Sequence, residues 1–355
     1  MTDYQHAEAP HGSVRPATIF DVARLAGVST KTVSRVLNNE ARVAEDTLAR
    51  VRAAVADLDY RPNPNARSLA GRRSYLIGLF YDNPSSNYMA DIKAGAIRRC
   101  QERGYHLLTE PCEATDPGLP RLMVGVATRF RLDGLILTPP LVDRADVLDA
   151  VALAGVPLIR IAPRIDPGRT QHVHMDDEAA ARLAADHLVA LGHRRLGMIL
   201  GHPDHGAAEL RQRGFLAACA AHGITPAPAH IMQGDFSFPG GFAAAETLLA
   251  LPDRPTAIFA CNDDMAAATV AAANKHGLQV PRDLSVVGFD DSPIARVIWP
   301  PLTTIRQPTM EMAAAAVDLL IGEGEAGPRQ LAFELIRRQS TAPVMALRQG
   351  RAAAP

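Results

Sequence analysis

Short apolar runs recur along the chain from Tyr75 onward, separated by Ala- and Leu-rich stretches of helical length. Apolar runs that alternate with helical stretches in this way are typical of strands buried in a parallel sheet. The runs are YLIGLFY, YHLLTE, DGLILTP, VPLIRIA, RRLGMIL, TAIFAC, LSVVGF and LTTIRQ. Their number predicts an α/β body made of two parallel-sheet subdomains. Two such sheets form a cleft at their strand ends, where ligands usually bind.

The pattern differs over residues 17–60, where apolar residues recur at helical spacing and predict three short helices. Thr18 can cap the first helix, with Asp21 as its partner three residues on, which makes a capping box. Gly27 ends that helix, and Ser29 can cap the second one. A tight turn is therefore expected between the first two helices, and the third helix completes a small core.

The second of these helices lies in the stretch GVSTKTVSRVLN and has one polar and one apolar face. The polar face carries Thr30, Lys31, Ser34, Arg35 and Asn38, and the apolar face carries Val33, Val36 and Leu37. A helix, a glycine turn and a polar-faced helix form the helix-turn-helix arrangement, whose second helix fits the DNA major groove. Arg and Lys suit the acceptor atoms of guanine, Thr can contact a thymine methyl, and Ser29 suits a phosphate. A solvated face in an ordinary three-helix cap is the alternative.

Charge is distributed unevenly, although the whole chain has a formal net charge of -1. Residues 15–73 hold 11 Arg and Lys against 6 Asp and Glu, a net of +5. The remainder holds 26 against 32, a net of -6. Only the first module is therefore expected to meet a polyanion.

The four cysteines lie far apart without a C-x-x-C pair, which argues against a metal knuckle or a redox motif and indicates buried thiols in a reducing cytosol. Residues 1–16 are polar and lack the apolar core of a signal peptide, and no apolar run is long enough to span a bilayer. We therefore expect a disordered tail at 1–16, a cytoplasmic protein and no membrane partner.

Between the two regions lies RPNPNARSLAGRRS, which predicts a very short helix. Asn63 and Pro64 suit its N-cap and first position, and Gly71 ends it after barely two turns. A helix this short is unstable alone in water, so it is expected to fold only when something holds it in place.

These segments resemble the lactose/galactose repressor family of transcriptional regulators. The resemblance is carried, in the family's order, by TIFDVARLAGVSTKTVSRVLN, VRAAVADLDYRPNPNARSLAG, DHLVALGHRRLGMILGHPD, LRQRGF, CNDDMAAATVAAANKHGLQVPRDLSVVGFDDSP and PPLTTIRQP. It implies a homodimer whose two heads bind a near-palindromic DNA operator, and a hinge helix, NARSLAG, that folds in the minor groove. Leu69 stands where the family has its intercalating leucine, and Arg72 is expected to contact a phosphate.

The candidate DNA-binding residues follow from the polar helix face and from this resemblance together. They are Thr18, Ser29, Thr30, Lys31, Thr32, Ser34, Arg35, Asn38, Arg42, Asn63, Ala66, Arg67, Leu69 and Arg72.

The resemblance also implies a division into domains. They are a tail at 1–16, a helix-turn-helix head at 17–61, a hinge at 62–73, an effector-binding and dimerisation body at 74–345, and a tail at 346–355. The first subdomain of the body is expected at 74–190 plus 307–333, and the second at 191–306 plus 334–345.

The body resembles the periplasmic sugar-binding fold that this family uses as its sensor. By motif, Arg211 in LRQRGF, Asn262 in CNDDMA and Asp290 in GFDD match the family's effector-binding residues. An arginine, an amide and a carboxylate can bind neighbouring hydroxyl groups of a small sugar. Helix and turn caps are the alternative roles, above all for Asn262, which precedes a helix.

Aromatic side chains are further candidates, because their faces stack on sugar rings. Phe236 matches a position where the family often has an aromatic residue, and Tyr81, Tyr88 and Trp299 are candidates for the opposite walls. Each of them suits the core as well. Asp176 in HMDDEA is a weaker effector candidate that suits a helix cap equally.

The sequence therefore predicts a sequence-specific transcriptional regulator, more often a repressor in this family, whose operator affinity a small sugar controls. A corepressor-dependent regulator is one alternative, because closure of the same cleft can favour either state. A transport sugar-binding protein is another; it would need a signal peptide and would lack the head.

No G-x-G-x-x-G, P-loop or G-x-S-x-G motif occurs, so neither an enzyme nor a cofactor is predicted. Four histidines that could be taken for metal ligands, His172, His174, His187 and His193, are spread over several elements, which favours structural roles. The end of the chain lacks the leucine heptads of a tetramerising helix, so a dimer is expected. Its operator partner places the protein at the nucleoid.

Overall fold

The computed structural model describes residues 17–37, 43–60, 73–323 and 327–344. The chain separates into two compact units, Met1–Ser74, here called the head, and Tyr75–Pro355, here called the body. Of the helices formed by the described residues, none combines the length and the apolar character needed to cross a membrane.

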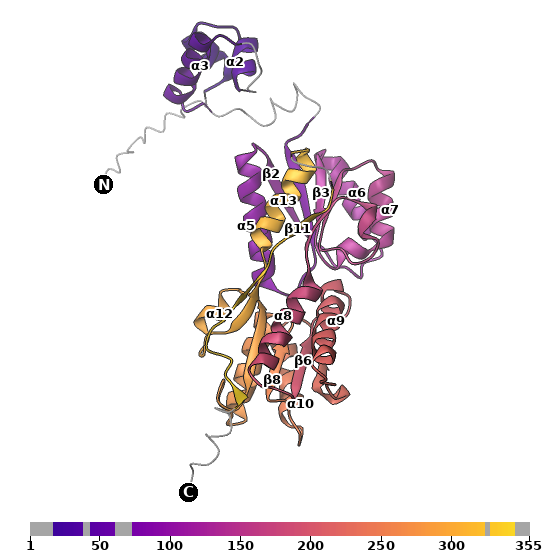
Figure 1. The fold of residues 1–355 in the computed structure, drawn as a ribbon. Coiled ribbons are helices and arrows are strands. Elements are labelled where there is room, and N and C mark those ends of the chain that lie inside the picture. The colour runs from indigo at the N-terminus through magenta and orange to yellow at the C-terminus, as the bar shows by residue number, and fades with distance from the viewer. Residues whose placement is uncertain (1–16, 38–42, 61–72, 324–326, 345–355) are drawn as a thin grey trace, which may run out of the picture. The chain divides into compact units, whose positions relative to one another are not determined.

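The described residues of the head form three short helices, α1 (Ile19–Ala26), α2 (Thr30–Leu37) and α3 (Glu45–Asp57), as the spacing predicts (Figure 1). Each helix buries its apolar side in one small core, in which Val22, Val33 and Val51 have no exposed surface. A helix of eight residues is too short to be stable alone, so this shared core holds the three together.

Both ends of α1 have the capping residues that the sequence predicts. The carboxylate of Asp21 accepts hydrogen bonds from the backbone N–H of Thr18, at 2.9 Å, and from its hydroxyl, at 2.6 Å. Gly27 has a φ of 63°, and the N–H of Val28 then donates to the carbonyl of Ala23 at 3.0 Å. This is a Schellman end, which needs a left-handed residue and so favours glycine. The turn to α2 follows directly.

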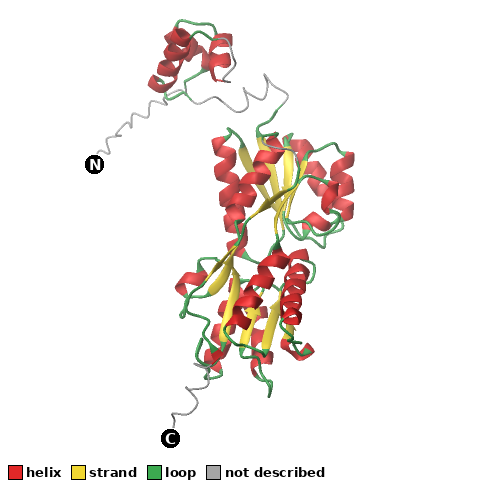
Figure 2. Ribbon diagram, viewed as in Figure 1, coloured by secondary structure: helices red, strands yellow, loops and turns green. Residues whose placement is uncertain are grey.

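Within the described part of the body, the strands form two sheets of six strands each (Figure 2). In spatial order the first sheet contains β11 (Arg329–Leu331), β5 (His172–Met175), β4 (Leu158–Ile161), β3 (Gly134–Leu137), β1 (Leu76–Tyr81) and β2 (His106–Pro111). The second contains β12 (Glu334–Ile336), β10 (Thr303–Arg306), β9 (Ser285–Asp290), β8 (Ala257–Ala260), β6 (Leu196–Leu200) and β7 (Ile231–Gln233). Neighbouring strands are parallel except β10 and β12. Both sheets have the same strand order, and only the direction of the last strand differs, so the topology occurs twice.

Helices cover both faces of each sheet (Figure 1). Each sheet with its helices is one half of the body. The helices of the first half, which contains the first sheet, are α5 (Ser86–Glu102), α6 (Leu119–Phe130), α7 (Ala145–Leu153) and α13 (Thr309–Ile321). In the second they are α8 (Asp177–Ala190), α9 (Gly206–Ala221), α10 (Phe238–Leu249), α11 (Asp263–Lys275) and α12 (Ile294–Val297). Single turns of 3-10 helix occur at Leu141–Asp143, Pro167–Arg169 and Pro228–His230. Because helices pack on both faces of the first sheet, neighbouring residues of β1 lie in different hydrophobic cores. Leu79 packs in one core and Phe80 in a second. Strands buried on both faces read as continuous apolar runs.

Within the described residues the chain passes between the two halves after β5, after β10, and between β11 and β12. Helix α8 packs on α9 and contacts β8, β10 and β12 of the second sheet. The expected subdomain boundary at residue 190 is therefore wrong, and the change of half falls before α8, near Asp176. The Ala-rich sequence of α8 predicts a helix but carries no sign of which sheet it covers.

Every run predicted as a strand overlaps one of the observed strands, and β2 and β9 extend one residue beyond their runs. Strands β5, β7, β11 and β12 are not predicted by the pattern. Strands β7, β11 and β12 are three residues long, partly exposed, and lie at sheet edges. A short edge strand buries too little surface to require an apolar run.

Candidate functional site

Helix α2 presents the polar face that the sequence predicts to meet DNA. Val33 and Val36 are buried on its other side, and Lys31 is exposed. The hydroxyl of Ser29 accepts a hydrogen bond from the N–H of Thr32 at 3.1 Å, so Ser29 caps this helix. The geometry gives Thr18 and Ser29 capping roles, and their contacts with DNA remain a prediction.

The other candidate DNA-binding residues divide into two groups. Thr30, Thr32, Ser34 and Arg35 lie on α2 and are half-buried. Asn38, Arg42, Asn63, Ala66, Arg67, Leu69 and Arg72 lie outside the described residues, together with the expected hinge segment NARSLAG.

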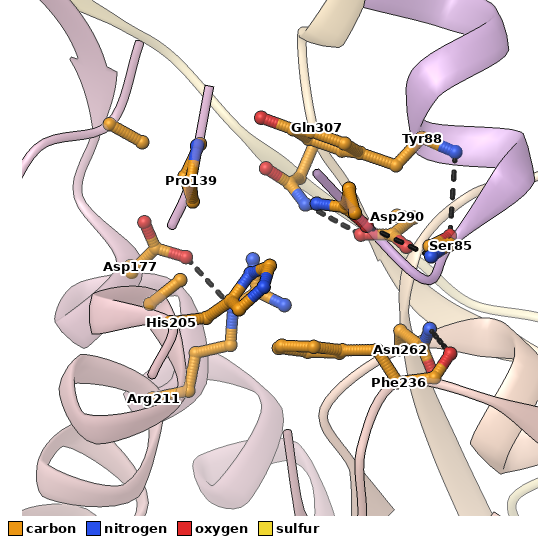
Figure 3. Close-up of a pocket in the computed structure, with 13 residues that line it drawn as sticks. Ser85, Tyr88, Pro139, Asp177, His205, Arg211, Phe236, Asn262, Asp290 and Gln307 are labelled. Atoms are coloured by element: carbon orange, nitrogen blue, oxygen red, sulfur yellow. Dashed lines mark hydrogen bonds and ion pairs between the residues drawn. The ribbon is translucent and has the colours of Figure 1, made fainter. Parts of the chain in front are cut away.

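A cavity with an empty volume of about 440 Å³, partly open to solvent, lies between the two halves of the body (Figure 3). It is lined by Asn83, Ser85, Tyr88, Pro139, Ala162, Asp177, His205, Ala207, Arg211, Phe236, Asn262, Asp290 and Gln307. In open parallel sheets, ligands bind at the carboxyl ends of the strands. The cavity has this position relative to both sheets.

The lining residues come from successive strand ends, which is why they meet although they are far apart in sequence. In the first half, Asn83 and Ser85 follow β1, Tyr88 lies in α5, Pro139 follows β3, and Ala162 follows β4. In the second half, Asp177 begins α8, His205 precedes α9, Ala207 and Arg211 lie in α9, Phe236 follows β7, Asn262 follows β8, Asp290 ends β9, and Gln307 follows β10.

Arg211 and Asp177 form a buried ion pair in the cavity wall. The Nε of Arg211 donates to Oδ1 of Asp177 at 2.8 Å, and the two side chains are 5% and 4% exposed. Its Nη1 donates to the carbonyl of Cys261 at 2.5 Å, and its guanidinium lies 3.6 Å from the centre of the Phe289 ring. Burial lowers the pKa of Arg211, but the carboxylates of Asp177 and Asp290 raise it above its ordinary value. Arg211 is therefore a fixed, ionised group.

Asp290 ends β9 with a φ of 113°, which residues other than glycine rarely adopt. Its Oδ1 accepts a hydrogen bond from Nε2 of Gln307 at 2.5 Å. Burial raises the pKa of Asp290 to about 7, against the opposing effect of Arg211. Near neutral pH this carboxyl group can therefore both accept and donate hydrogen bonds to a ligand.

Asn262 has the capping role considered for it and also lies in the cavity wall. Its Oδ1 accepts from the N–H of Met265 at 2.9 Å, which caps α11, and its Nδ2 donates to the carbonyl of Phe236 at 2.8 Å. Each of its two polar atoms has capacity for one more hydrogen bond. The amide is therefore held rigidly while it faces the cavity.

Aromatic rings supply the apolar part of the wall. The centres of the Phe236 and His205 rings lie 5.3 Å apart. Burial lowers the pKa of His205 to about 4, so this ring is neutral at pH 7. Burial also raises the pKa of Tyr88, which keeps its hydroxyl protonated. An apolar wall with a few fixed polar groups is typical of a small-molecule site.

Three sequence candidates do not line this cavity. Asp176 is exposed and caps α8, its carboxylate accepting from the N–H of Ala179 at 2.9 Å. Tyr81 accepts a hydrogen bond from Lys93 at 2.7 Å, and Trp299 is 76% exposed. Assigning Asp176 and Tyr81 to the cavity is therefore wrong, because a helix start and a lysine on α5 hold them elsewhere.

Other lining residues are missed by sequence reasoning, above all Asp177, His205 and Gln307. Gln307 directly follows β10, so the rule that ligand groups follow strand ends could have found it. Asp177 directly follows Asp176, the effector candidate named from the sequence. Two consecutive acidic residues at a helix start do not indicate which side chain faces the cavity.

The two units together define a class: a helix-turn-helix head followed by a two-sheet body with a ligand-sized cavity is the architecture of a ligand-responsive DNA-binding regulator. Comparison with known families agrees. Residues 18–63 match the model of bacterial regulatory proteins of the lacI family, and residues 185–341 match a periplasmic binding protein-like domain.

Similar proteins extend over most of the chain. The ribose operon repressor of Escherichia coli (strain K12) is 36% identical over 307 residues, which is 86% of this chain and 92% of that protein. The transcriptional repressor PurR of Photobacterium profundum is 36% identical over 308 residues, 86% of this chain and 91% of that protein. The chain therefore belongs to the lacI family of bacterial regulatory proteins.

Solved structures agree with this assignment. A Lac repressor dimer bound to operator and an anti-inducer is 32% identical, with a TM-score of 0.75, and the match covers 92% of this chain and 100% of that one. A complex of the transcriptional regulator CelR with cellobiose is 30% identical, with a TM-score of 0.68, and the match covers 91% and 99%.

Proposed function

We propose that this lacI-family regulator is a repressor whose affinity for a DNA operator depends on a small sugar-like effector bound in the body. The observation that carries the proposal is the cavity, because its walls come from both halves of the body and hold an arginine, an amide and a carboxyl group around a space of about 440 Å³. Similar proteins support it, since one is named as the repressor of a ribose operon and another was solved in a complex with cellobiose.

On the DNA side, α2 reads the major groove with Thr30, Lys31 and Arg35, and Ser29 with the first amides of the helix contacts a phosphate. The hinge residues named from the sequence complete the minor-groove contact. A homodimer on a near-palindromic operator is proposed because the Lac repressor was solved as a dimer on its operator. The DNA partner places the protein at the nucleoid in the cytoplasm.

On the effector side, Arg211, Asn262 and Asp290 bind hydroxyl groups, and Phe236 and Tyr88 supply the apolar contact. The cavity binds its ligand without converting it, as expected of a regulator. A ligand that contacts both halves stabilises one arrangement of them, and this arrangement can favour either DNA-bound or DNA-free protein. An inducer and a corepressor are both compatible with this mechanism.

The proposal can be tested with the purified full chain. An operator is selected from random DNA, and its affinity is measured by fluorescence anisotropy with and without each member of a sugar panel. We expect one sugar to change the operator affinity by about tenfold or more, the usual size of allosteric coupling. Selection of no preferred DNA sequence, or an operator affinity that no sugar changes, contradicts the proposal.

A further inference from the structure

The charges around the cavity are nearly balanced before any ligand enters. Among the described residues that line it, Arg211 is the one that is positively charged at neutral pH, and its Nε already donates to Asp177 at 2.8 Å. His205 is neutral, because burial holds its pKa at about 4. Asp290 is a second carboxyl group with a pKa of about 7. The cavity therefore carries a net charge between zero and minus one.

The arginine is also badly placed to hold an anion. Tight binding of a phosphate or carboxylate uses two parallel N–H groups of one guanidinium. Here Asp177 occupies Nε, and the carbonyl of Cys261 occupies one hydrogen of Nη1. Among the described residues we find no hydrogen-bond partner for Nη2, so this nitrogen can donate to neutral ligand oxygens.

Helix starts are the other common anion sites, because their free N–H groups point along the helix axis. Helices α8, α9 and α11 all begin at or beside this cavity. Each already has acidic residues in its first turn: Asp177 and Glu178, Glu209, and Asp263 and Asp264, respectively. The negative charges of these carboxylates oppose the binding of a phosphate at the helix starts.

We propose that Asp177 makes this cavity selective for an uncharged sugar or polyol and against its phosphate ester. Hydroxyl groups donate to Asp290 and accept from Arg211 without adding charge. A phosphate brings about two negative charges into a cavity whose described lining residues include no unpaired cation. The inference rests on the proposed function, since it concerns the ligand of the same cavity.

Calorimetry with the full chain tests this directly. The probes are neutral aldopentoses and aldohexoses and their 5- or 6-phosphates. We expect at least one neutral sugar to bind about a hundredfold more tightly than its phosphate, as befits an unpaired buried charge. A phosphate that binds as tightly as its parent sugar overturns the charge selectivity and leaves the effector function standing. Binding of no probe at all refutes the proposed sugar effector and this inference with it.

A pair of matched variants assigns the selectivity to Asp177. Asp177→Asn leaves the charge of Arg211 unbalanced, and we expect the ratio of sugar to phosphate affinity to fall about tenfold or more. Asp176→Asn removes the same charge one residue earlier. We expect it to change nothing, because Asp176 is exposed and Asn caps a helix equally well.

A second comparison separates charge from structure. The double variant Asp177→Asn/Arg211→Gln lacks the cation as well, so the ratio of sugar to phosphate affinity should rise again. If Asp177→Asn lowered this ratio by damaging the fold, the second substitution would not restore it. An unchanged ratio in Asp177→Asn overturns the role of Asp177. If that variant does not fold, as judged by circular dichroism, the ratio measured on the unmodified protein still decides the charge selectivity.

Discussion

Asp290 combines burial, an unfavourable backbone angle and four neighbouring charges in one residue. Its φ of 113° persists because the strand end and Gln307 hold it. Burial raises its pKa to about 7, Arg211 lowers the pKa, and Asp264 and Asp177 raise it. Asp263, also buried, titrates in the same cluster with a raised pKa. A small change of pH near 7 therefore changes the charge of this site.

Effector binding should weaken as the pH falls from 8 to 6. The ionised carboxylate accepts hydrogen bonds from ligand hydroxyls more strongly than the protonated carboxyl group does, so we expect the affinity to be highest above the pKa of about 7 and to fall below it. Ionisation with this pKa gives a loss of about tenfold over the two pH units. Calorimetry at several pH values measures it. Asp290→Asn should bind more weakly and show no such dependence, while His205, with a pKa of about 4, stays neutral throughout.

In the head, Lys31→Ala and Arg35→Ala should weaken operator binding. Both residues lie on the polar face of α2, and the loss of a base-edge contact costs about 1–3 kcal/mol. Anisotropy with the selected operator measures the loss, and calorimetry should show unchanged sugar binding. Arg52→Ala on α3 removes an exposed charge from the same unit and should have a smaller effect. Operator affinities equal to that of the unmodified protein for both α2 variants would remove this helix from the interface.

At the scale of elements, the apolar runs predict the central strands, because a strand covered on both faces must be apolar throughout. The edge strands β7, β11 and β12 are not predicted, because they are short and partly exposed and so need no continuous apolar run. Motif and strand-end position together lead to Arg211, Asn262 and Asp290, all of which line the cavity. Whether Asp176 or Asp177 turns inward depends on how α8 packs on the second sheet, and that packing is a tertiary property without a local signal.

The loop after β4 forms a rigid part of the cavity wall. Arg160, which has no exposed surface, donates to the carbonyls of Ile165, at 2.9 Å, and Asp166, at 2.5 Å, and to the hydroxyl of Thr170 at 2.9 Å. A buried arginine bound to carbonyls of one loop fixes that loop in place. Ala162, at the start of the loop, lines the cavity.

This loop touches the second half of the body at the start of α9. Arg164 forms an ion pair with Glu209 at 3.1 Å, and a Cβ added at Gly206 would lie 2.4 Å from the Cβ of Arg164. Gly206→Ala should therefore push the two halves apart beside the cavity and weaken effector binding by about 1–3 kcal/mol, the usual cost of overpacking. Calorimetry with a sugar that the panel shows to bind measures the loss.

Gly125→Ala is the matched control for this prediction. Gly125 lies in α6, where an added Cβ meets no atom within 4 Å. The substitution should raise the stability of the helix by about 0.5–1 kcal/mol and leave the effector affinity unchanged. Equal effector affinities in Gly206→Ala and Gly125→Ala would show that the contact between the loop and α9 plays no part in binding.

At the scale of the whole molecule, the repeated topology explains why one ligand can act on the whole body. Both sheets turn their strand ends toward the same cavity, and the halves are joined by chain crossings after β5, after β10, and between β11 and β12 in the described residues. In the proposed function, a ligand held by Arg211 and Asp290 from one half and Tyr88 from the other stabilises one arrangement of the two halves. Its binding free energy thereby becomes available for coupling to the operator.

Asp290→Asn should reduce this coupling without affecting the head. Asn is close in size to Asp and tolerates the backbone conformation, but the loss of a hydrogen bond to a charged group costs about 1.5–3 kcal/mol. The effector concentration for half-maximal response should therefore rise roughly ten- to a hundredfold, since about 1.4 kcal/mol corresponds to tenfold. Operator affinity without effector should stay unchanged.

In cells, the same variant reports the sign of the coupling through a reporter gene behind the selected operator. Cells with Asp290→Asn behave as if effector were absent at ordinary effector concentrations. For an inducer, this means repression that the sugar does not relieve, and for a corepressor, expression that the sugar does not shut off. A reporter response identical to that of the unmodified protein would show that Asp290 does not contribute to effector binding. Because the variant leaves the head unaltered, either altered phenotype arises in the cavity.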